Sequence, residues 1–244
     1  MKKIAGILIV LVLLLVVALV TVTFFLGSIV KKGLETVGPR VAQVEVKLDS
    51  ANISFFSGHG QLKGFLLGNP PGFDSPSAIK VGEITLDVQP GSVFSDKIVV
   101  RTLHVLAPEI TLYGLTGDNL KKILDNLQTS SGGASTNRAP SAKKADKAEK
   151  KLQVDDLLIQ SGKVLVVLPM VGKATVSLPD IHLTDLGQGS AGLTPADLSS
   201  KIVDAIYRAA IAAAANVGKG VLDVGKPAAK QLDKAAQKLG NLFK

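Results

Sequence analysis

The chain contains no cysteine and no tryptophan, and only three histidines and two tyrosines. Without cysteine there is no attachment point for a lipoprotein's lipid and no thiolate to help bind a metal. The absence fits oxidising and reducing compartments equally well. Aromatic residues make up only 4% of the chain, which argues against a pocket lined by rings. The plentiful Val, Leu, Ile, Ala and Gly favour strands and small-residue helices instead.

Signatures of enzymes are also missing. His59 lies in a glycine turn, His104 lies in a β-branched run, and His182 follows a Pro-Asp pair, so no two histidines have metal-ligand spacing. There is no G-x-S-x-G, Walker A or dinucleotide fingerprint. Asp155 and Asp156 are adjacent on an expected strand and would point to opposite faces. We therefore expect a non-catalytic protein without a metal or cofactor.

One long uncharged stretch runs from Ile4 to Val30. Its densely apolar part, the 23 residues from Ile4 to Leu26, would span roughly 34 Å as a helix, enough for a hydrocarbon core of about 30 Å. A signal peptide is the alternative, but its apolar core would be shorter and a small-residue cleavage site should follow. We expect residues 1–30 to be an uncleaved transmembrane anchor. Lysines flank both of its ends, so charge alone leaves the topology open.

The net charge of +8 is not uniform along the chain, and two basic segments stand out. Lys143 to Lys151 is a basic tether that could bind anionic lipid or nucleic acid, but it lacks the aromatic residues that stack on bases, so we expect no nucleic-acid partner. The last segment, Pro227 to Phe243, has a stripe of lysines opposite a leucine and alanine face. This pattern predicts either headgroup contact at a membrane or a solvated face of a packed helix. The stripe comprises Lys226, Lys230, Lys234 and Lys238.

A period of two predicts strands through most of the chain. Apolar residues alternate from Val44 to Leu48, and the phase changes within Ile79 to Val88, which predicts a bulge at Gly82-Glu83. Further strands are expected at 52–56, 62–67, 97–106, 109–113, 152–160, 163–168, 173–178 and 181–186. Together these predict an α+β fold with about ten mostly antiparallel strands in a curved or sandwich-like sheet.

Helical spacing predicts helices between and beyond the strands. A short interfacial helix should cover Gly27 to Arg40 and end at Gly38-Pro39, and a second should cover Thr116 to Gln128. Thr194, Pro195 and Asp197 have the order of an N-cap, a first-turn proline and a capping-box acid. The expected divisions are an anchor (1–30), a first strand group with flanking helices (31–128), a disordered linker (129–151), a second strand group (152–192) and C-terminal helices (193–244).

Several turn and strand segments resemble those of the AsmA-like envelope proteins of Gram-negative bacteria. The first is LKGFLLGNPPGF, Leu62 to Phe73, whose turn contains Asn69, Pro70, Gly72 and Phe73. The others are LDVQPGSVFSD (86–96), IVVRTLHVLAPEI (98–110), GDNLKKILDNL (117–127), and LPDIHLTDLG (178–187) before the GLTPADL helix. The resemblance covers most of the chain, although its motifs are turn and strand patterns.

The resemblance implies a single-pass anchor in the inner membrane, with the body in the periplasm. It also implies a curved sheet with an apolar inner face that takes part in phospholipid handling or outer-membrane assembly. Membrane lipids, envelope proteins or further copies of the chain would be its partners. The chain is too short to bridge a periplasm alone. The candidate lipid-facing residues are Val44, Val46, Leu48, Ile84, Leu86, Val88, Ile98 and Val100.

Two alternatives remain open at this stage. The alanine-rich C-terminal helix could cover the apolar sheet face completely, leaving a structural or protein-binding module with no lipid groove. A closed sandwich like the late-embryogenesis-abundant type 2 domains, which also have an anchor and an Asn-Pro turn, would have no groove either.

Overall fold

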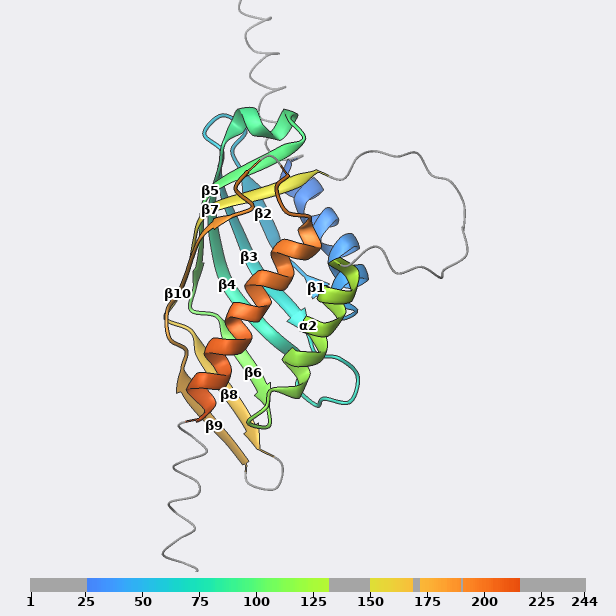
Figure 1. Cartoon of the computed structure of the whole chain (residues 1–244), viewed down its shortest axis with the longest axis vertical. Helices are drawn as coiled ribbons and strands as arrows, with labels where there is room; N and C mark the ends of the chain where they lie inside the picture. The colour runs from blue at the N-terminus through green and yellow to red at the C-terminus, as the bar shows by residue number, and fades with distance from the viewer. Residues whose placement is uncertain (1–25, 132–149, 169–171, 190, 216–244) are drawn as a thin grey trace, which may run out of the picture.

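A ten-stranded sheet forms the body of the molecule, and three helices lie against one of its faces (Figure 1). The computed structural model describes residues 26–131, 150–168, 172–189 and 191–215. The strands are β1 (Val46–Lys47), β2 (Ser50–Ile53), β3 (His59–Gly68), β4 (Ser77–Val88), β5 (Lys97–Leu106), β6 (Glu109–Tyr113), β7 (Lys151–Gln160), β8 (Lys163–Leu168), β9 (Gly172–Ser177) and β10 (Ile181–Leu186). The helices are residues 26–42, α2 (Asp118–Ser131) and residues 195–215, with the short 3-10 helix η1 (Pro90–Phe94).

Several strands lie end to end, so the sheet is simpler than its strand number indicates. β4 pairs with both β5 and β6, β7 and β8 continue one row, and β10 and β9 form the next. Backbone hydrogen bonds continue across the breaks, from Ala107 N to Gln160 O and from Lys163 N to Pro108 O, both at 2.8 Å. The prolines and glycines at these breaks therefore interrupt strands without separating the rows.

Two of the pairings are parallel. β5 pairs with β7, and β6 pairs with β8, whereas all the other pairings are antiparallel. The chain passes from β6 through α2 before it returns as β7, as a parallel connection requires. The expectation of a mostly antiparallel α+β fold is confirmed. In detail the sheet is mixed, because it contains these two parallel pairings.

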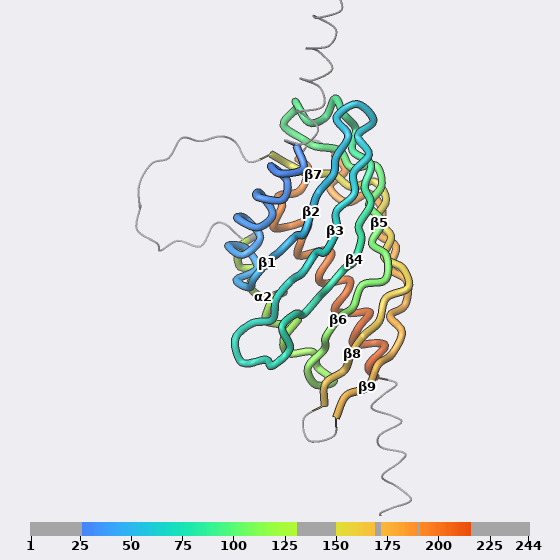
Figure 2. The backbone as a smooth tube through the Cα atoms, turned by 180° about the vertical axis from the view of Figure 1, so that it is seen from behind, coloured from blue at the N-terminus to red at the C-terminus, as the bar shows by residue number. Residues whose placement is uncertain are grey.

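The main core lies between the sheet and the helices, which all cover the same face (Figure 2). On the sheet side it contains fully buried residues of β6, β7 and β8, including Leu112, Leu157 and Val166. α2 contributes residues at helical spacing, and the helix of residues 195–215 contributes small residues that permit close approach. These helical residues are Leu120, Ile123, Leu124, Leu127, Leu198, Val203, Ile206, Ala210, Ala213 and Ala214.

Local breakers do not end the first helix where the sequence predicts. The helix continues through Gly38 and Pro39 to residue 42, so the predicted end is wrong. A Cβ atom at Gly38 would come within 2.9 Å of Val46, which shows how closely this turn packs on β1. Tertiary packing therefore outweighs local preference. The helix also lies on the sheet, because Leu34 and Val41 pack against the core.

The predicted bulge at Gly82-Glu83 is also wrong. Lys63 pairs with Glu83 and Phe65 pairs with Val81 in the same register, so no residue is inserted there. The register shifts instead at Leu67/Gly68 and at Asp87/Val88. Ile79 and Val81 are nevertheless buried in the core against which Ile84 packs. Gly64, which lies between the two pairs, has a positive φ of 63°. The backbone of β3 therefore departs from extended geometry at this position without an extra residue.

Three sequence predictions fall wholly or mostly outside the described residues: the anchor from Ile4 to Leu26, most of the 129–151 linker, and the lysine stripe of Lys226, Lys230, Lys234 and Lys238. At the linker's ends, α2 continues to Ser131 and β7 begins at Lys151. Within the described ranges, no helix combines the length and the apolar character needed to cross a membrane.

Candidate functional site

The eight candidate lipid-facing residues separate into three environments. Val44, Val46 and Leu48 are buried, with exposed fractions of 7%, 6% and 1%. They lie beside and within β1, at the sheet margin where the helix of residues 26–42 packs. Leu48 N also donates a hydrogen bond of 3.1 Å to the Glu35 carboxylate of that helix. Protein atoms therefore surround these three side chains.

Ile84 and Val100 form the second group. Both are half-buried and pack against the main core. Ile84 pairs with Val105 and Leu62, and Val100 pairs with Val88 and Val154. These two residues extend the apolar face of the sheet beyond its fully buried part.

Leu86, Val88 and Ile98 form the third group. They are half-buried and, among the described residues, are not part of the core cluster. All three lie near the connection of β4 to β5 through η1. Leu86 lies over Gly60, where an added Cβ atom would come within 3.0 Å of its Cγ. Toward this end of the sheet, therefore, apolar residues are half-buried without belonging to the main core.

This end carries a cluster of phenylalanines that the sequence did not reveal. Phe55 lies edge-on to Phe56, with ring centroids 5.7 Å apart, and to Phe94 of η1, with centroids 6.0 Å apart. Phe56 is 65% exposed and Phe94 is 75% exposed. We call Phe55, Phe56 and Phe94 the aromatic tip. The sequence indicated a strand through Phe56, but the strand ends at Ile53, so both rings of the Phe-Phe pair belong to a turn.

The aromatic tip lies at the end where the chain enters the fold. η1 and the β2–β3 turn are at the same end of the molecule as the start of the helix of residues 26–42 (Figure 1). The first turn of this helix touches β2, because a Cβ atom at Gly27 would overlap the backbone oxygen of Ala51. We call this end the entry end.

The Asn-Pro turn of the resemblance has a structural role. Asn69 Nδ2 donates to Ser75 O, and Asn69 Oδ1 accepts from Asn119 Nδ2, both at 2.8 Å. Pro70 is fully buried, Gly72 has φ 99°, and Phe73 packs on Tyr113 with ring centroids 4.9 Å apart. The turn therefore ties the β3–β4 connection to the start of α2.

Asn119 completes that connection from a fully buried position. Its Nδ2 also donates to Thr111 O at 2.8 Å, and its Oδ1 accepts from Tyr113 N at 3.0 Å. One side chain thus joins β6, α2 and the Asn-Pro turn. The sequence does not single it out, because an asparagine in the first turn of a helix usually faces solvent.

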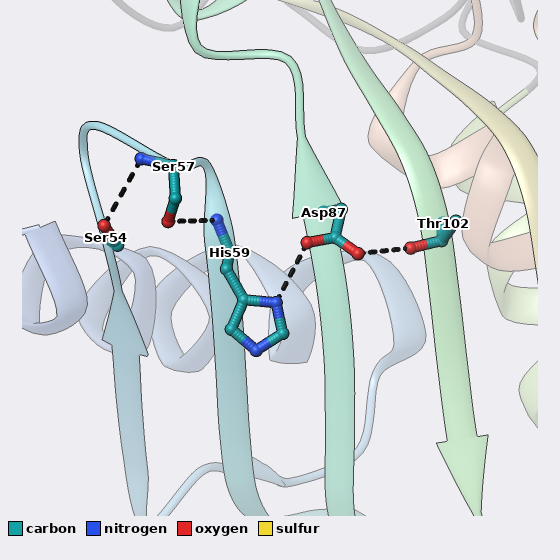
Figure 3. Close-up of polar contacts among 5 residues, drawn as sticks. All are labelled: Ser54, Ser57, His59, Asp87 and Thr102. Atoms are coloured by element: carbon teal, nitrogen blue, oxygen red, sulfur yellow. Dashed lines mark hydrogen bonds and ion pairs between the residues drawn. The ribbon is translucent and has the colours of Figure 1, made fainter.

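Paired histidines and aspartates lie on the face away from the helices. His59 Nδ1 is 2.9 Å from Asp87 Oδ1, and Thr102 donates to Asp87 Oδ2 at 2.8 Å (Figure 3). The hydrogen bond from His59 is the main cause that lowers the pKa of Asp87, and the bond from Thr102 adds to it. His182 Nε2 lies 3.0 Å from Asp156 Oδ1 in a second exposed pair.

Each of these pairs links two neighbouring strands. In the part of the chain that the structure describes, no three His, Asp or Glu side chains are grouped so that they could hold a metal ion. Asp155 is bonded to Gln153 Nε2 at 2.6 Å, apart from the pair that Asp156 makes. The contacts are cross-strand links on an exposed sheet face.

Comparisons of the chain with protein-family models, with curated proteins and with solved structures found no match.

Proposed function

We propose that this chain is a membrane-anchored protein of the AsmA-like type that handles envelope lipids by non-catalytic binding. Its anchor would cross the inner membrane once and its body would lie in the periplasm. The observation that carries the proposal is the set of half-buried apolar residues Leu86, Val88 and Ile98 near the entry end. A lipid leaving the bilayer beside the anchor would meet this part of the sheet first.

The curved apolar face supplies the chemistry for this role. An acyl chain needs only contact with apolar atoms and exclusion of water, at about 25 cal/mol for each Å² buried. Val88 and Ile98 flank the η1 connection, and Leu86 continues their face along β4 toward Ile84. An acyl chain would therefore lie along β4 and β5 and approach the core where the helices begin to cover the sheet.

Photo-crosslinking in the full chain tests this proposal. A benzoyl-phenylalanine at position 86 should form adducts with phospholipid in native membranes. Position 85 is the matched control, because neighbouring residues on a strand point to opposite faces. Phospholipid adducts at 86 but not at 85 would support the proposal, and equal or absent adducts would refute it.

A second function is a structural or protein-binding module with a closed core. The observation that favours it is the burial of Val44, Val46 and Leu48 together with the helices on the same sheet face. Under this alternative, position 86 would form adducts with protein or with no partner. The envelope proteins or further copies of this chain that it binds would then be found in those adducts.

A further inference from the structure

The aromatic tip joins two connections of the fold and leaves two of its three rings exposed. The described residues contain five phenylalanines, of which Phe65 packs against the core and Phe73 packs on Tyr113. The other three are gathered on two separate connections, the β2–β3 turn and η1. Single exposed apolar residues are ordinary on a protein surface, but three contacting rings form a patch.

The patch lies close to the point where the chain enters the fold. The densely apolar part of the uncharged segment ends at Leu26, and the chain enters the fold at Gly27, beside Ala51. Phe55 follows Ala51 by four residues, so it lies within roughly 15 Å along an extended chain. If Ile4 to Leu26 crosses a bilayer, the aromatic tip lies at the depth of the membrane surface.

Lysine side chains lie close to the aromatic tip. The Lys150 ammonium donates to the carbonyl oxygens of Val93 and Ser95 and so lies against η1. Lys151 N bonds to Asp96 O, and the Lys97 side chain lies nearby, bonded to Gln153 and Gly189. These three lysines lie at this end together with the carboxylates of Asp96, of Asp155, which accepts from Gln153, and of Asp87, which pairs with His59. Rings that enter the interface beside lysines are a common mode of membrane contact.

We infer that the aromatic tip inserts into the headgroup region of the membrane that holds the anchor, with Phe56 and Phe94 as the penetrating side chains. This contact fixes the entry end of the sheet on the bilayer, so that the face formed by Leu86, Val88 and Ile98 opens toward the lipids. The inference rests on the membrane anchoring included in the proposed function, but it does not require lipid to bind the sheet.

The absence of tryptophan makes a direct test possible. The substitution Phe94→Trp introduces a single fluorophore at an exposed site with little change in shape. The full chain is reconstituted into vesicles of phosphatidylcholine and phosphatidylglycerol that contain lipids brominated at shallow positions. Emission should shift to the blue, and quenching should be several-fold stronger than for Leu115→Trp, which replaces an exposed residue between β6 and α2.

Phe56→Trp provides a second reporter on the other connection, and circular dichroism checks that each variant is folded. Quenching at 94 and 56 but not at 115 supports membrane insertion. Quenching at 94 and 56 no greater than at 115 overturns it. Lipid adducts at position 86 are scored separately. If the tryptophans are quenched but position 86 forms no lipid adducts, membrane insertion of the tip stands and the lipid-handling proposal is rejected. If adducts form at position 86 but the tryptophans are not quenched, only the insertion of the tip is rejected.

Discussion

Asn119 shows how one buried polar side chain holds three segments together. The substitution Asn119→Ala removes its bonds to Asn69, Thr111 and Tyr113, and it leaves one buried group, on Thr111, and two partly buried groups without this partner. Each group left without a partner costs about 1–3 kcal/mol. We therefore expect the free energy of unfolding to fall by about 3 kcal/mol in urea titrations.

Asn52→Ala is the control for this substitution, because Asn52 is exposed on β2. Its effect should lie within about 0.5 kcal/mol of zero. Equal losses from the two substitutions would contradict the role that we assign to Asn119.

The exposed pair of His59 and Asp87 should make the stability of the fold depend on pH. The folded-state pKa of Asp87 lies below its ordinary value of 3.8. The ionised carboxylate therefore stabilises the fold above that pH, and this contribution is lost as the pH falls through the lowered pKa. His59→Ala should raise the pKa of Asp87 toward 3.8 in an NMR titration of the carboxyl group. His182→Ala, which alters the pair with Asp156, should leave it unchanged.

At the scale of elements, the start of the helix of residues 195–215 is a reciprocal cap, as the sequence predicts. Thr194 Oγ1 accepts from Asp197 N at 3.0 Å and donates to the Asp197 carboxylate at 2.6 Å. Thr194→Ala should lower the free energy of unfolding by about 1 kcal/mol, whereas Thr194→Ser retains the hydroxyl and most of the stability. Urea unfolding of both variants measures the difference, and identical losses would show that the cap contributes nothing.

Local elements could be predicted from the sequence because their signals are local. The alternation from Val44 to Leu48 places every second residue inside, and the strands from Lys97 to Leu106 and from Glu109 to Tyr113 have the expected bounds. The helix through Gly38 and Pro39 could not be predicted, because its reason is the contact with Val46 on another element. The same limit applies to the aromatic tip, since nothing in the sequence brings Phe94 to Phe55.

At the scale of the whole molecule, the pairing of strands lay beyond the sequence. A period of two indicates which face of a sheet a residue lies on but not which strand lies beside it. The parallel pairing of β5 with β7 therefore has no signal in the sequence. The sequence also leaves open whether helices cover the apolar sheet face or whether a closed sandwich buries it. The structure covers the face at Val44, Val46 and Leu48 and leaves Leu86 half-buried.

This unequal covering predicts different outcomes for two aspartate substitutions. Leu86→Asp should abolish phospholipid adducts at a neighbouring photo-reactive position 88 while the protein remains folded and membrane-inserted. Leu48→Asp places a charge at a site that is 1% exposed and should unfold the domain. Limited proteolysis of both variants in membranes distinguishes them. If Leu86→Asp also unfolds the protein, Leu86 belongs to the core and the lipid-handling proposal loses its central residue.

The two parallel pairings also order the assembly of the protein in time. Strands β1 to β6 pair with segments close in the chain, whereas Val100 meets Val154 and Glu109 meets Lys163 across 54 positions. Pairings between distant segments form slowly, because the entropy cost of closing a long loop comes before the contacts that stabilise the pairing. During synthesis the first six strands can form a sheet before β7 leaves the ribosome. We expect the seam of β5 and β6 with β7 and β8 to form last. Until it does, the edge of β5 and β6 lacks its partner strands and can pair with a neighbouring chain.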